Sequence, residues 1–248
     1  MGIIYVVGIG PGGPGSFTME AVEALRSAEV LVGYGPYLDY VEKVVDLEGK
    51  QIYTSGMRSE LERCSYALEQ AAKGYTTCIV STGDAGLYGM AGPIYEMREE
   101  LGLTEQVKVK VVPGVSAIFS AAAALGAPLM HDTVMISLSD LLTPWEKIEK
   151  RLSLAAEADF VIGLYNPRSK KRREQLPRAL ELIGEHRSPG TPVGMVKNAG
   201  RGGEQIRITT LDQVDEDFVD MCTLLIIGNS NTYLQAGAMI TPRGYENK

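Results

Sequence analysis

Three glycines near the start of the chain have the spacing of a phosphate-binding turn. Gly8, Gly10 and Gly13 match G-x-G-x-x-G, with which dinucleotide-binding proteins bring a pyrophosphate against backbone N–H groups at the start of a helix. The corresponding activity would be that of an NAD-dependent oxidoreductase. The pattern alone is a weak signal, so the surrounding residues decide how it is interpreted.

Those surrounding residues argue against a dinucleotide. A dinucleotide site needs a glycine turn that runs directly into the helix, and an acidic residue at the end of the second strand to bind the ribose. Residues 11–15, Pro-Gly-Gly-Pro-Gly, favour an irregular loop, so the helix cannot begin before Ser16 or Thr18. The second predicted strand ends in Val-Gly-Tyr at 32–34 and offers no carboxylate there. A glycine-rich turn with no ligand is the simplest alternative.

Composition limits the classes of partner. The 248 residues are 45% hydrophobic and 22% charged, which predicts a compact globular protein of one or two domains. The net charge of −7 opposes non-specific binding of nucleic acid, so a polyanionic partner would need a local basic cluster. The N-terminal residues lack a basic signal-peptide region and no apolar run is long enough to span a bilayer. We expect a soluble cytoplasmic protein without a membrane partner.

The metal-ligating residues are few. Cys64, Cys78 and Cys222 are odd in number and far apart, which fits neither a disulfide framework nor a metal knuckle. With His131 and His186 as the only histidines, we expect no metal site.

The elements that must position a site alternate between strand and helix in the first half. Residues 3–9 form an apolar, β-branched run typical of a strand covered on both faces, and Thr18 is a candidate N-cap for a helix over 18–28. Ser59 and Glu62 match a capping box that opens a helix ending at Gly74. Its apolar stripe comprises Leu61, Cys64, Leu68 and Ala71. Strands are also expected at 29–34, 76–81 and 107–112, and helices from Pro36, at 89–102 and at 114–126. This order predicts a parallel sheet with helices on its faces.

The second half has more closely spaced strands. Strands are expected at 133–138, 159–165, 192–196, 204–210 and 223–229, and helices at 144–158 and 169–186. Thr143 and Glu146 match a second capping box, with Pro144 at the first helical position. Little helix separates the last strands, which favours a mixed sheet. The sequence therefore predicts two α/β domains, 1–113 with a parallel sheet and 114–248 with a mixed one, separated at Pro113-Gly114 and with a cleft between them.

Three motifs occur in order at or just past the ends of predicted strands: GIGPG from Gly8, STGDAGLYGMAGPIYE from Ser81, and VPGVSA from Val112. Ligands of open α/β sheets bind at those ends. These motifs resemble the tetrapyrrole methylase family, and the match runs through most of the chain. The resemblance implies a class III methyltransferase fold that uses S-adenosylmethionine as methyl donor, releases S-adenosylhomocysteine, and acts on a porphyrin-like ring, with assembly as a homodimer.

The resemblance also assigns the methyl donor's binding residues: Pro11, Thr82, Gly83, Asp84, Leu87, Ser116, Ala117, Asn166 and Ala199. Asp84 has a rationale of its own, because a carboxylate can pair with an ammonium group or accept from a ribose hydroxyl. Asp84 is equally interpretable as a turn residue, and Ser116 and Ala117 as small residues that allow close helix packing. Ala85 departs from the family, whose members often have proline there.

A carboxylated ring implies a basic and apolar substrate surface. Arg58 and Arg63 form one candidate group of cations, and Arg168 with Lys170 and the basic run to Arg173 forms another. A solvated helix face is the alternative for the run from Lys170. Tyr34 and Met57 are candidates to pack on the ring plane, although aromatic residues beside glycines are more often core.

Within the family, further motifs are similar to members that methylate carbon 17 of a precorrin-3-type ring and contract it, in cobalamin biosynthesis. Contraction moves protons, so a general acid or base is needed near the ring. The candidates are Glu60, Asp132, Asp140 and Tyr34. Methylation at carbon 11 or 20 is the main alternative, and an NAD-dependent oxidoreductase or a non-catalytic tetrapyrrole carrier the others.

Overall fold

A computed structural model describes residues 1–245 and divides the chain into two compact units. The first unit is Met1–Ala117 and the second begins at Ile118. The boundary between the two units therefore lies at the start of a helix, whereas the sequence predicted it at Pro113-Gly114, in the loop before that helix.

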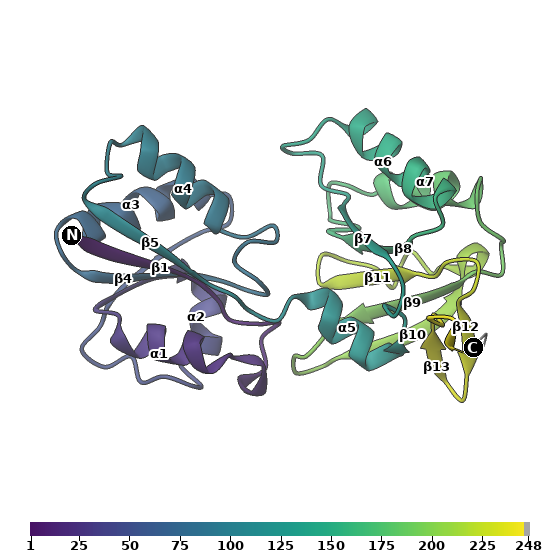
Figure 1. The fold of residues 1–248 in the computed structure, drawn as a ribbon, viewed down its shortest axis with the longest axis horizontal. Coiled ribbons are helices and arrows are strands. Elements are labelled where there is room, and N and C mark those ends of the chain that lie inside the picture. Colours follow the sequence, from purple (N-terminus) through teal and green to yellow (C-terminus); the bar gives the residue numbers. More distant parts are fainter. Residues whose placement is uncertain (246–248) are drawn as a thin grey trace. The chain divides into compact units, whose positions relative to one another are not determined.

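The first unit is a sheet covered by helices on both faces (Figure 1). Its strands are β1 (Gly2–Gly8), β2 (Val30–Tyr34), β3 (Gln51–Ser55), β4 (Thr76–Ser81) and β5 (Val107–Val112). Its helices are α1 (Met19–Ser27), α2 (Gly35–Val41), α3 (Glu60–Ala72) and α4 (Ala91–Glu100), with a 3-10 turn at Pro14–Ser16. The strand order is β3-β2-β4-β1-β5, and each pairing is parallel, as predicted. The edge strand β3 was not predicted, because the sequence indicated two successive helices between β2 and β4.

Burial on both faces explains why the central strands are apolar throughout. Helices α3 and α4 cover the face that includes Ile4 and Ile79, whereas α1 and α2 cover the face that includes Val7 and Leu31. These four side chains have no exposed surface. The two clusters hold the central strands rigidly, so the loops at the strand ends start from fixed positions.

Helix starts were predicted with mixed success. Thr18 caps α1 as expected, because its hydroxyl oxygen accepts from the N–H of Ala21 at 3.1 Å. The Ser59–Glu62 capping box is wrong: within residues 1–245 the Ser59 side chain caps no N–H of α3, since its backbone (φ −109°, ψ 34°) is not extended. Leu61 is also 64% exposed, so the buried stripe of α3 lacks it, whereas Cys64, Leu68 and Ala71 are buried as predicted.

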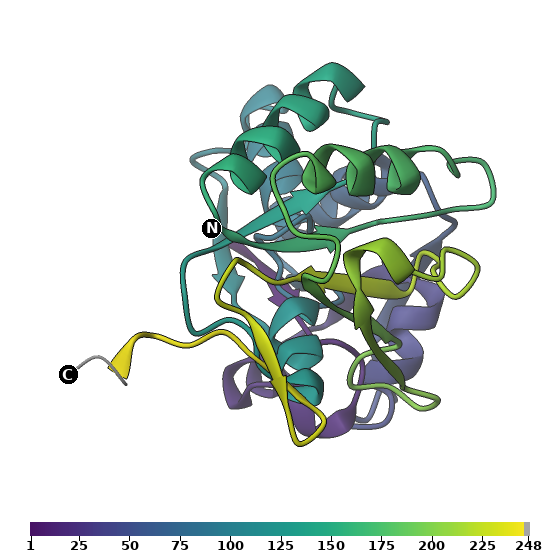
Figure 2. The ribbon, with the colours of Figure 1, turned by 90° about the vertical axis from the view of Figure 1, so that its right-hand side faces the viewer.

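The second unit is built on a mixed sheet in the order β10-β9-β11-β8-β7. Its strands are β7 (Thr133–Ser137), β8 (Val161–Tyr165), β9 (Pro192–Lys197), β10 (Gln205–Thr210) and β11 (Thr223–Ile227). Its helices are α5 (Ala117–Leu125), which begins at the last residue of the first unit, α6 (Trp145–Glu157) and α7 (Gln175–Gly184). Strands β7 and β8 are parallel, and β11 is antiparallel to both β8 and β9. Figure 2 shows α6 and α7 together over one face of this sheet, where their apolar sides join one core.

Two helix predictions in this unit are wrong at their starts. Helix α6 begins at Trp145, and Pro144 is its extended N-cap (ψ 138°) instead of its first residue, so the Thr143 capping box does not form. The helix predicted over 169–186 is shorter, because residues 169–174 precede α7. There Ser169 and Arg172 close a turn, with the Ser169 N–H donating to the Arg172 carbonyl at 2.9 Å. The basic run from Lys170 therefore lies in a loop and not on a helix face.

A third, three-stranded sheet was not predicted. It joins β6 (Gly126–Ala127) to the hairpin of β12 (Tyr233–Gln235) and β13 (Ala238–Ile240). These strands have only two or three residues each, which is too short for a hydrophobic period to be read. In the described part of the chain, no helix is long and apolar enough to cross a membrane.

The cysteines give a test of this fold. Cys64 and Cys78 are buried, and loss of hydration raises the pKa of the Cys64 thiol to about 12 and that of the Cys78 thiol well above its ordinary value. Because the thiolate is the reactive form, only the exposed Cys222 should react with a thiol reagent at pH 8. We expect one fast equivalent in the native protein and three in denaturant; rapid labelling of all three without denaturant would contradict this packing.

Candidate functional site

The strand order of the first sheet creates a topological switch point, at which the connections from two neighbouring strands run to opposite sides of the sheet. Strands β1 and β4 are neighbours, but the crossover after β1 leads to β2 on one side and the crossover after β4 leads to β5 on the other. Because all strands are parallel, their carboxyl ends lie along one edge of the sheet. Ligands of open α/β sheets bind at such a point, so this edge is the primary candidate site.

The loops after β1 and β4 are joined there through their backbones. Gly10 and Gly83 form an isolated bridge, in which the N–H of Gly83 donates to the carbonyl of Gly10 at 2.7 Å and the reverse bond measures 3.1 Å. Both glycines have positive φ values (74° and 68°), a conformation that L side chains rarely adopt. The bridge places Pro11 beside the Thr82–Leu87 segment.

Asp84 holds the loops after β4 and β5. Its Oδ1 accepts from the N–H groups of Gly86 at 2.8 Å and Leu87 at 3.1 Å, and its Oδ2 accepts from the N–H of Gly114 at 3.0 Å. Asp84 is therefore a turn residue, as one of the two interpretations of the sequence predicted. An ionised carboxylate has about four acceptor positions, so this arrangement also leaves capacity for a ligand donor.

A close approach of three backbone segments brings these loops together. A Cβ on Gly114 would lie 2.3 Å from the carbonyl oxygen of Gly83 and 2.6 Å from the carbonyl carbon of Gly8, and one on Gly8 would lie 2.8 Å from the N atom of Gly114. Only glycine allows these distances. Ser116 is buried and Ala117 half-buried just beyond, so the structure gathers seven predicted donor-binding residues at one edge. They are Pro11, Thr82, Gly83, Asp84, Leu87, Ser116 and Ala117.

The remaining two predicted donor-binding residues belong to the second unit. Asn166 directly follows β8, and Ala199 follows β9 by two residues. Since β11 is antiparallel to both strands, β8 and β9 run in the same direction, so Asn166 and Ala199 share one edge of the second sheet. The side-chain amide of Asn166 donates to the hydroxyl of Ser137 at 3.0 Å, which connects the ends of β8 and β7.

The predicted substrate residues after β3 have different surroundings. Arg63 is 5% exposed, and its Nη1 donates to the carbonyl of Gly56 at 2.8 Å and to the hydroxyl of Ser55 at 3.0 Å. Its Nη2 lies 3.4 Å from the carboxylate of Glu60, a predicted proton carrier. Arg63 therefore holds a loop, whereas Met57 and Arg58 on that loop are exposed. Tyr34, at the end of the adjoining β2, is half-buried.

Predicted residues of the second unit are distributed over two edges. Arg168 donates to the carbonyl of Glu216 and to the carboxylate of Asp217, whereas Lys170 is exposed. Asp140 follows the carboxyl end of β7 and accepts from Gln175 at 2.8 Å. Asp132 precedes β7, so it lies at the opposite, amino edge of the sheet and is not brought together with Asp140.

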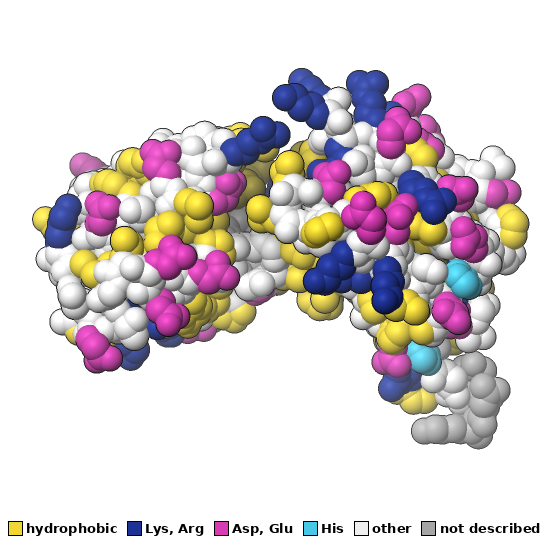
Figure 3. Space-filling model, turned by 90° about the horizontal axis from the view of Figure 1, so that it is seen from above, with side chains coloured by type: hydrophobic (Ala, Val, Ile, Leu, Met, Phe, Trp, Pro, Cys, Tyr) yellow, Lys and Arg dark blue, Asp and Glu magenta, His cyan; other side chains and the backbone are white. Residues whose placement is uncertain are grey.

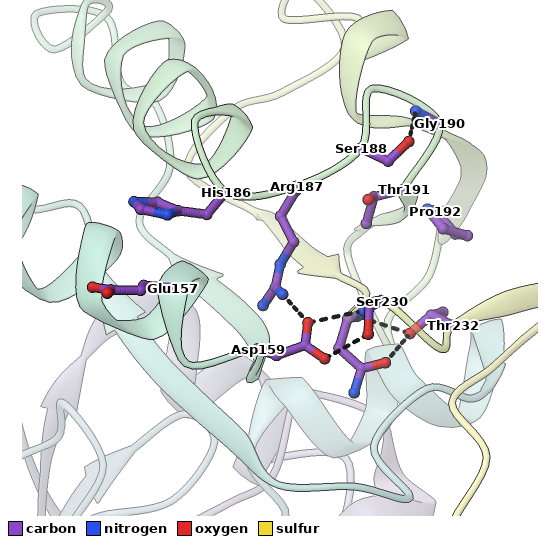
Figure 4. A pocket seen from close by; sticks show the side chains of 11 residues that line it. Glu157, Asp159, His186, Arg187, Ser188, Gly190, Thr191, Pro192, Ser230 and Thr232 are labelled. Atoms are coloured by element: carbon purple, nitrogen blue, oxygen red, sulfur yellow. Dashed lines mark hydrogen bonds and ion pairs between the residues drawn. The ribbon is translucent and has the colours of Figure 1, made fainter.

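A hollow of about 500 Å³ lies at that amino edge (Figure 4). Asp159 there binds the guanidinium of Arg187, and Ser230 donates to it through both its N–H, at 3.0 Å, and its hydroxyl, at 2.7 Å. Burial lowers the pKa of the Arg187 guanidinium. These groups bind one another, although the buried Nε of Arg187 has no hydrogen-bond partner among the described residues, and they lie away from every motif of the sequence. We interpret the hollow as a structural clamp. Across residues 1–245, no group of three or more His, Cys, Asp or Glu could hold a metal ion.

Sequence reasoning missed two features of the first unit's site. Gly114 was interpreted as a domain boundary, although its N–H binds Asp84; a Pro-Gly pair directly after a buried strand was the available signal. Tyr88 was not singled out, yet it has a positive φ of 54°. No sequence pattern indicates that conformation for a tyrosine, because asparagine, aspartate and glycine are the residues typical of it.

Comparisons with known proteins agree on one family. The family of tetrapyrrole (corrin/porphyrin) methylases matches residues 3–215. A probable cobalt-factor III C(17)-methyltransferase of Salmonella typhimurium is 51% identical, over 98% of this chain and 99% of that protein. A precorrin-3B C(17)-methyltransferase of a Sinorhizobium species is 43% identical, over 98% of this chain and 97% of that protein.

Solved structures give the same result. The methyltransferase CobJ matches with a TM-score of 0.91 and 37% identity, over 98% of this chain and all of that one. A uroporphyrin-III C-methyltransferase from Thermus thermophilus, in complex with S-adenosylhomocysteine, matches with a TM-score of 0.67 over 92% of this chain and 97% of that one. At 24% identity, the second match shows a shared fold only.

The glycine contact yields a first prediction for the site. Gly114→Ala should lower the free energy of unfolding by about 1–3 kcal/mol, because its Cβ meets backbone atoms that cannot move aside. Gly92→Ala in α4 is the matched control, since its Cβ meets no atom within 4 Å. Urea unfolding measures both; equal midpoints for the two variants would contradict the close approach.

Asp84 yields a second prediction. Asp84→Ala removes the acceptor for three backbone N–H groups and should cost about 1–3 kcal/mol of stability. Asp39→Ala, at an exposed position of α2, should change stability by less than about 0.5 kcal/mol. A small effect of Asp84→Ala in the same unfolding assay would show that the carboxylate does not hold these loops.

Proposed function

The chain belongs to the tetrapyrrole methylases, and from this premise we propose that it methylates carbon 17 of a precorrin-3-type ring with S-adenosylmethionine and contracts the ring. The reaction belongs to cobalamin biosynthesis. The observation that carries the proposal is the 51% identity, over nearly the whole chain, to a relative named for C(17) methylation of cobalt-factor III.

The first unit's site suits the methyl donor. Its wall is largely backbone, and Asp84 and the N–H and C=O groups of the glycine loops are polar partners for an amino-acid end and a ribose. Ser116 and Ala117 are small enough for an adenosine to approach. We therefore propose that these residues, with Pro11, Thr82, Gly83 and Leu87, hold the donor. Asn166 and Ala199, at one edge of the second unit's sheet, stay predicted donor-binding residues. The S-adenosylhomocysteine in the Thermus thermophilus protein supports this assignment at the level of the fold.

The chemistry explains why no nucleophilic side chain is needed. When bound, S-adenosylmethionine supplies a methyl group that is already electrophilic because it is attached to a positively charged sulfur. The protein then has to align a ring carbon with that methyl group and exclude water. The buried thiol of Cys64 is in any case a poor nucleophile, because burial raises its pKa and keeps it protonated.

The ring brings several carboxylates to a protein of net charge −7, so local cations must bind them. Figure 3 shows acidic and basic side chains interspersed over the face in view, without one dominant sign. We propose that Arg58 and Lys170, both exposed, contact the carboxylates. Arg63 and Arg168 are engaged by protein groups, so we assign them to holding the loops; Met57 and Tyr34 pack on the ring.

Ring contraction also needs a proton carrier. Tyr34 ends β2 and Glu60 lies after the adjoining β3, both at the carboxyl edge of the first sheet, and Asp140 follows a strand of the second. Asp132 lies at the amino edge of its sheet. We therefore favour Tyr34, Glu60 and Asp140 over Asp132 for this role. A cytoplasmic location and assembly as a homodimer remain predictions.

The test is turnover with a methyl donor labelled with ¹³C in the methyl group. We expect cobalt-factor III, or the oxidised metal-free precorrin-3B, to gain the mass of one methyl group and to carry the label on carbon 17 by NMR. Gly114→Ala should reduce turnover because it displaces the donor-binding loops, and Gly92→Ala should not.

Other outcomes would contradict the proposal in distinct ways. Label at carbon 11 or 20 would show that the protein is a methyltransferase that acts on a different ring carbon. Ring binding without a mass gain would indicate a carrier. Thermal stabilisation by NAD, with none by S-adenosylhomocysteine, would return the dinucleotide alternative.

A further inference from the structure

Two bulky residues of the first unit have a left-handed backbone without the residue type that tolerates it. Arg58 has φ 67° and Tyr88 has φ 54°. Asn166 and Asn198, at strand ends of the second unit, have similar values, but asparagine adopts this conformation readily. Arginine and tyrosine do not, and such strain persists only where the surrounding structure enforces it.

Arg63 fixes the conformation of the loop around Arg58. The buried guanidinium of Arg63 donates to the carbonyl of Gly56 at 2.8 Å and to the hydroxyl of Ser55 at 3.0 Å, so the chain is fixed just before the strained residue. Helix α3 begins at Glu60 and fixes it just after. Three residues must complete the turn, and the middle one takes the positive φ.

Nothing within its own unit explains why this position is an arginine. The Arg58 side chain is exposed, and among residues 1–117 it has neither a hydrogen bond nor an ion pair. A glycine would adopt the same backbone without strain. The exposed guanidinium of Arg58 is therefore available to a ligand at the edge of the sheet.

Tyr88 is held in the same manner by the loop after β4. Asp84 fixes the N–H groups of Gly86 and Leu87 before it, and Gly89 after it packs so closely that a Cβ would lie 2.5 Å from the carbonyl oxygen of Ala85. The Tyr88 side chain is 54% exposed. Half of a large aromatic surface is thus presented to solvent from a strained position.

We propose that Arg58 and Tyr88 are substrate-binding residues whose strained backbone is the cost of presenting them. Arg58 pairs with a peripheral carboxylate of the tetrapyrrole, and the Tyr88 ring packs on the macrocycle. Their loops follow β3 and β4, which are two strands apart and therefore about 10 Å from each other, at the same edge of the sheet. The inference rests on the proposed function and adds Tyr88 and the reason for Arg58's conformation.

The test uses the conflict between stability and binding. Arg58→Gly relieves strain at an exposed position, so it should raise the melting temperature by about 2–4 °C. Tyr88→Gly relieves strain as well but also removes a partly buried ring that has a contact, so its effect is measured on ring binding alone. Both variants should weaken binding of cobalt-factor III, followed by its absorbance, by about tenfold. The affinity for S-adenosylhomocysteine, measured by calorimetry, should not change. Ala236→Gly is the matched control: Ala236 has φ 49° in the β12–β13 turn, so its replacement should stabilise without altering ring affinity.

Two further variants separate the side chain from loop flexibility. Arg58→Asn tolerates the left-handed backbone without glycine's freedom and should lose ring affinity as Arg58→Gly does, whereas Arg58→Lys should retain part of it. Unchanged ring affinity in Arg58→Gly and Tyr88→Gly, with normal turnover by the wild type, would overturn this inference and leave the proposed function standing. A wild type that binds no ring would overturn both.

Discussion

The first unit's site depends on backbone segments that approach one another more closely than any side chain would allow. Gly8 ends β1, Gly83 follows β4 and Gly114 follows β5, and a single added methyl group at Gly114 would overlap the backbone of both other segments. The Asp84 carboxylate then fixes the arrangement by accepting from three N–H groups in two loops. The carboxyl ends of three strands thereby form one continuous surface.

This surface has a chemical consequence. A wall of peptide groups offers donors and acceptors whose positions are set by the sheet, so they need little rearrangement when a polar ligand binds. Such a wall suits a donor that already contains its own electrophile. The neighbouring end of β2 and the loop after β3 have the opposite character, with Tyr34, Met57 and Arg58 offering aromatic, apolar and cationic side chains. One sheet edge thus provides two kinds of surface.

The features that sequence could predict are those set by local chemistry. The apolar run of β1, the Thr18 cap and the alternation of four strands with helices led to the parallel sheet, although β3 was missed. The Pro-Gly-rich loop correctly indicated that no α-helix begins before Ser16. The predictions failed where a distant group decides. Ser59 does not cap α3, and the loop before it is held by Arg63 through the carbonyl of Gly56. Asp84 and Gly114 meet only after β4 and β5 have paired with β1. The positive φ of Tyr88 likewise arises from its loop and not from its residue type.

The small third sheet has a consequence for the order in which the chain folds during synthesis. Strand β13 pairs with β6, so Met239 meets Gly126 across almost the whole length of the second unit. The first unit draws its sheet from residues that emerge from the ribosome early, and it can complete itself while the rest is still being made. The main sheet of the second unit can pair once β11 has been made, but β6 has no strand partner until the β12–β13 hairpin emerges. Until then the backbone of β6 is an unpaired segment that is open to chaperones and proteases.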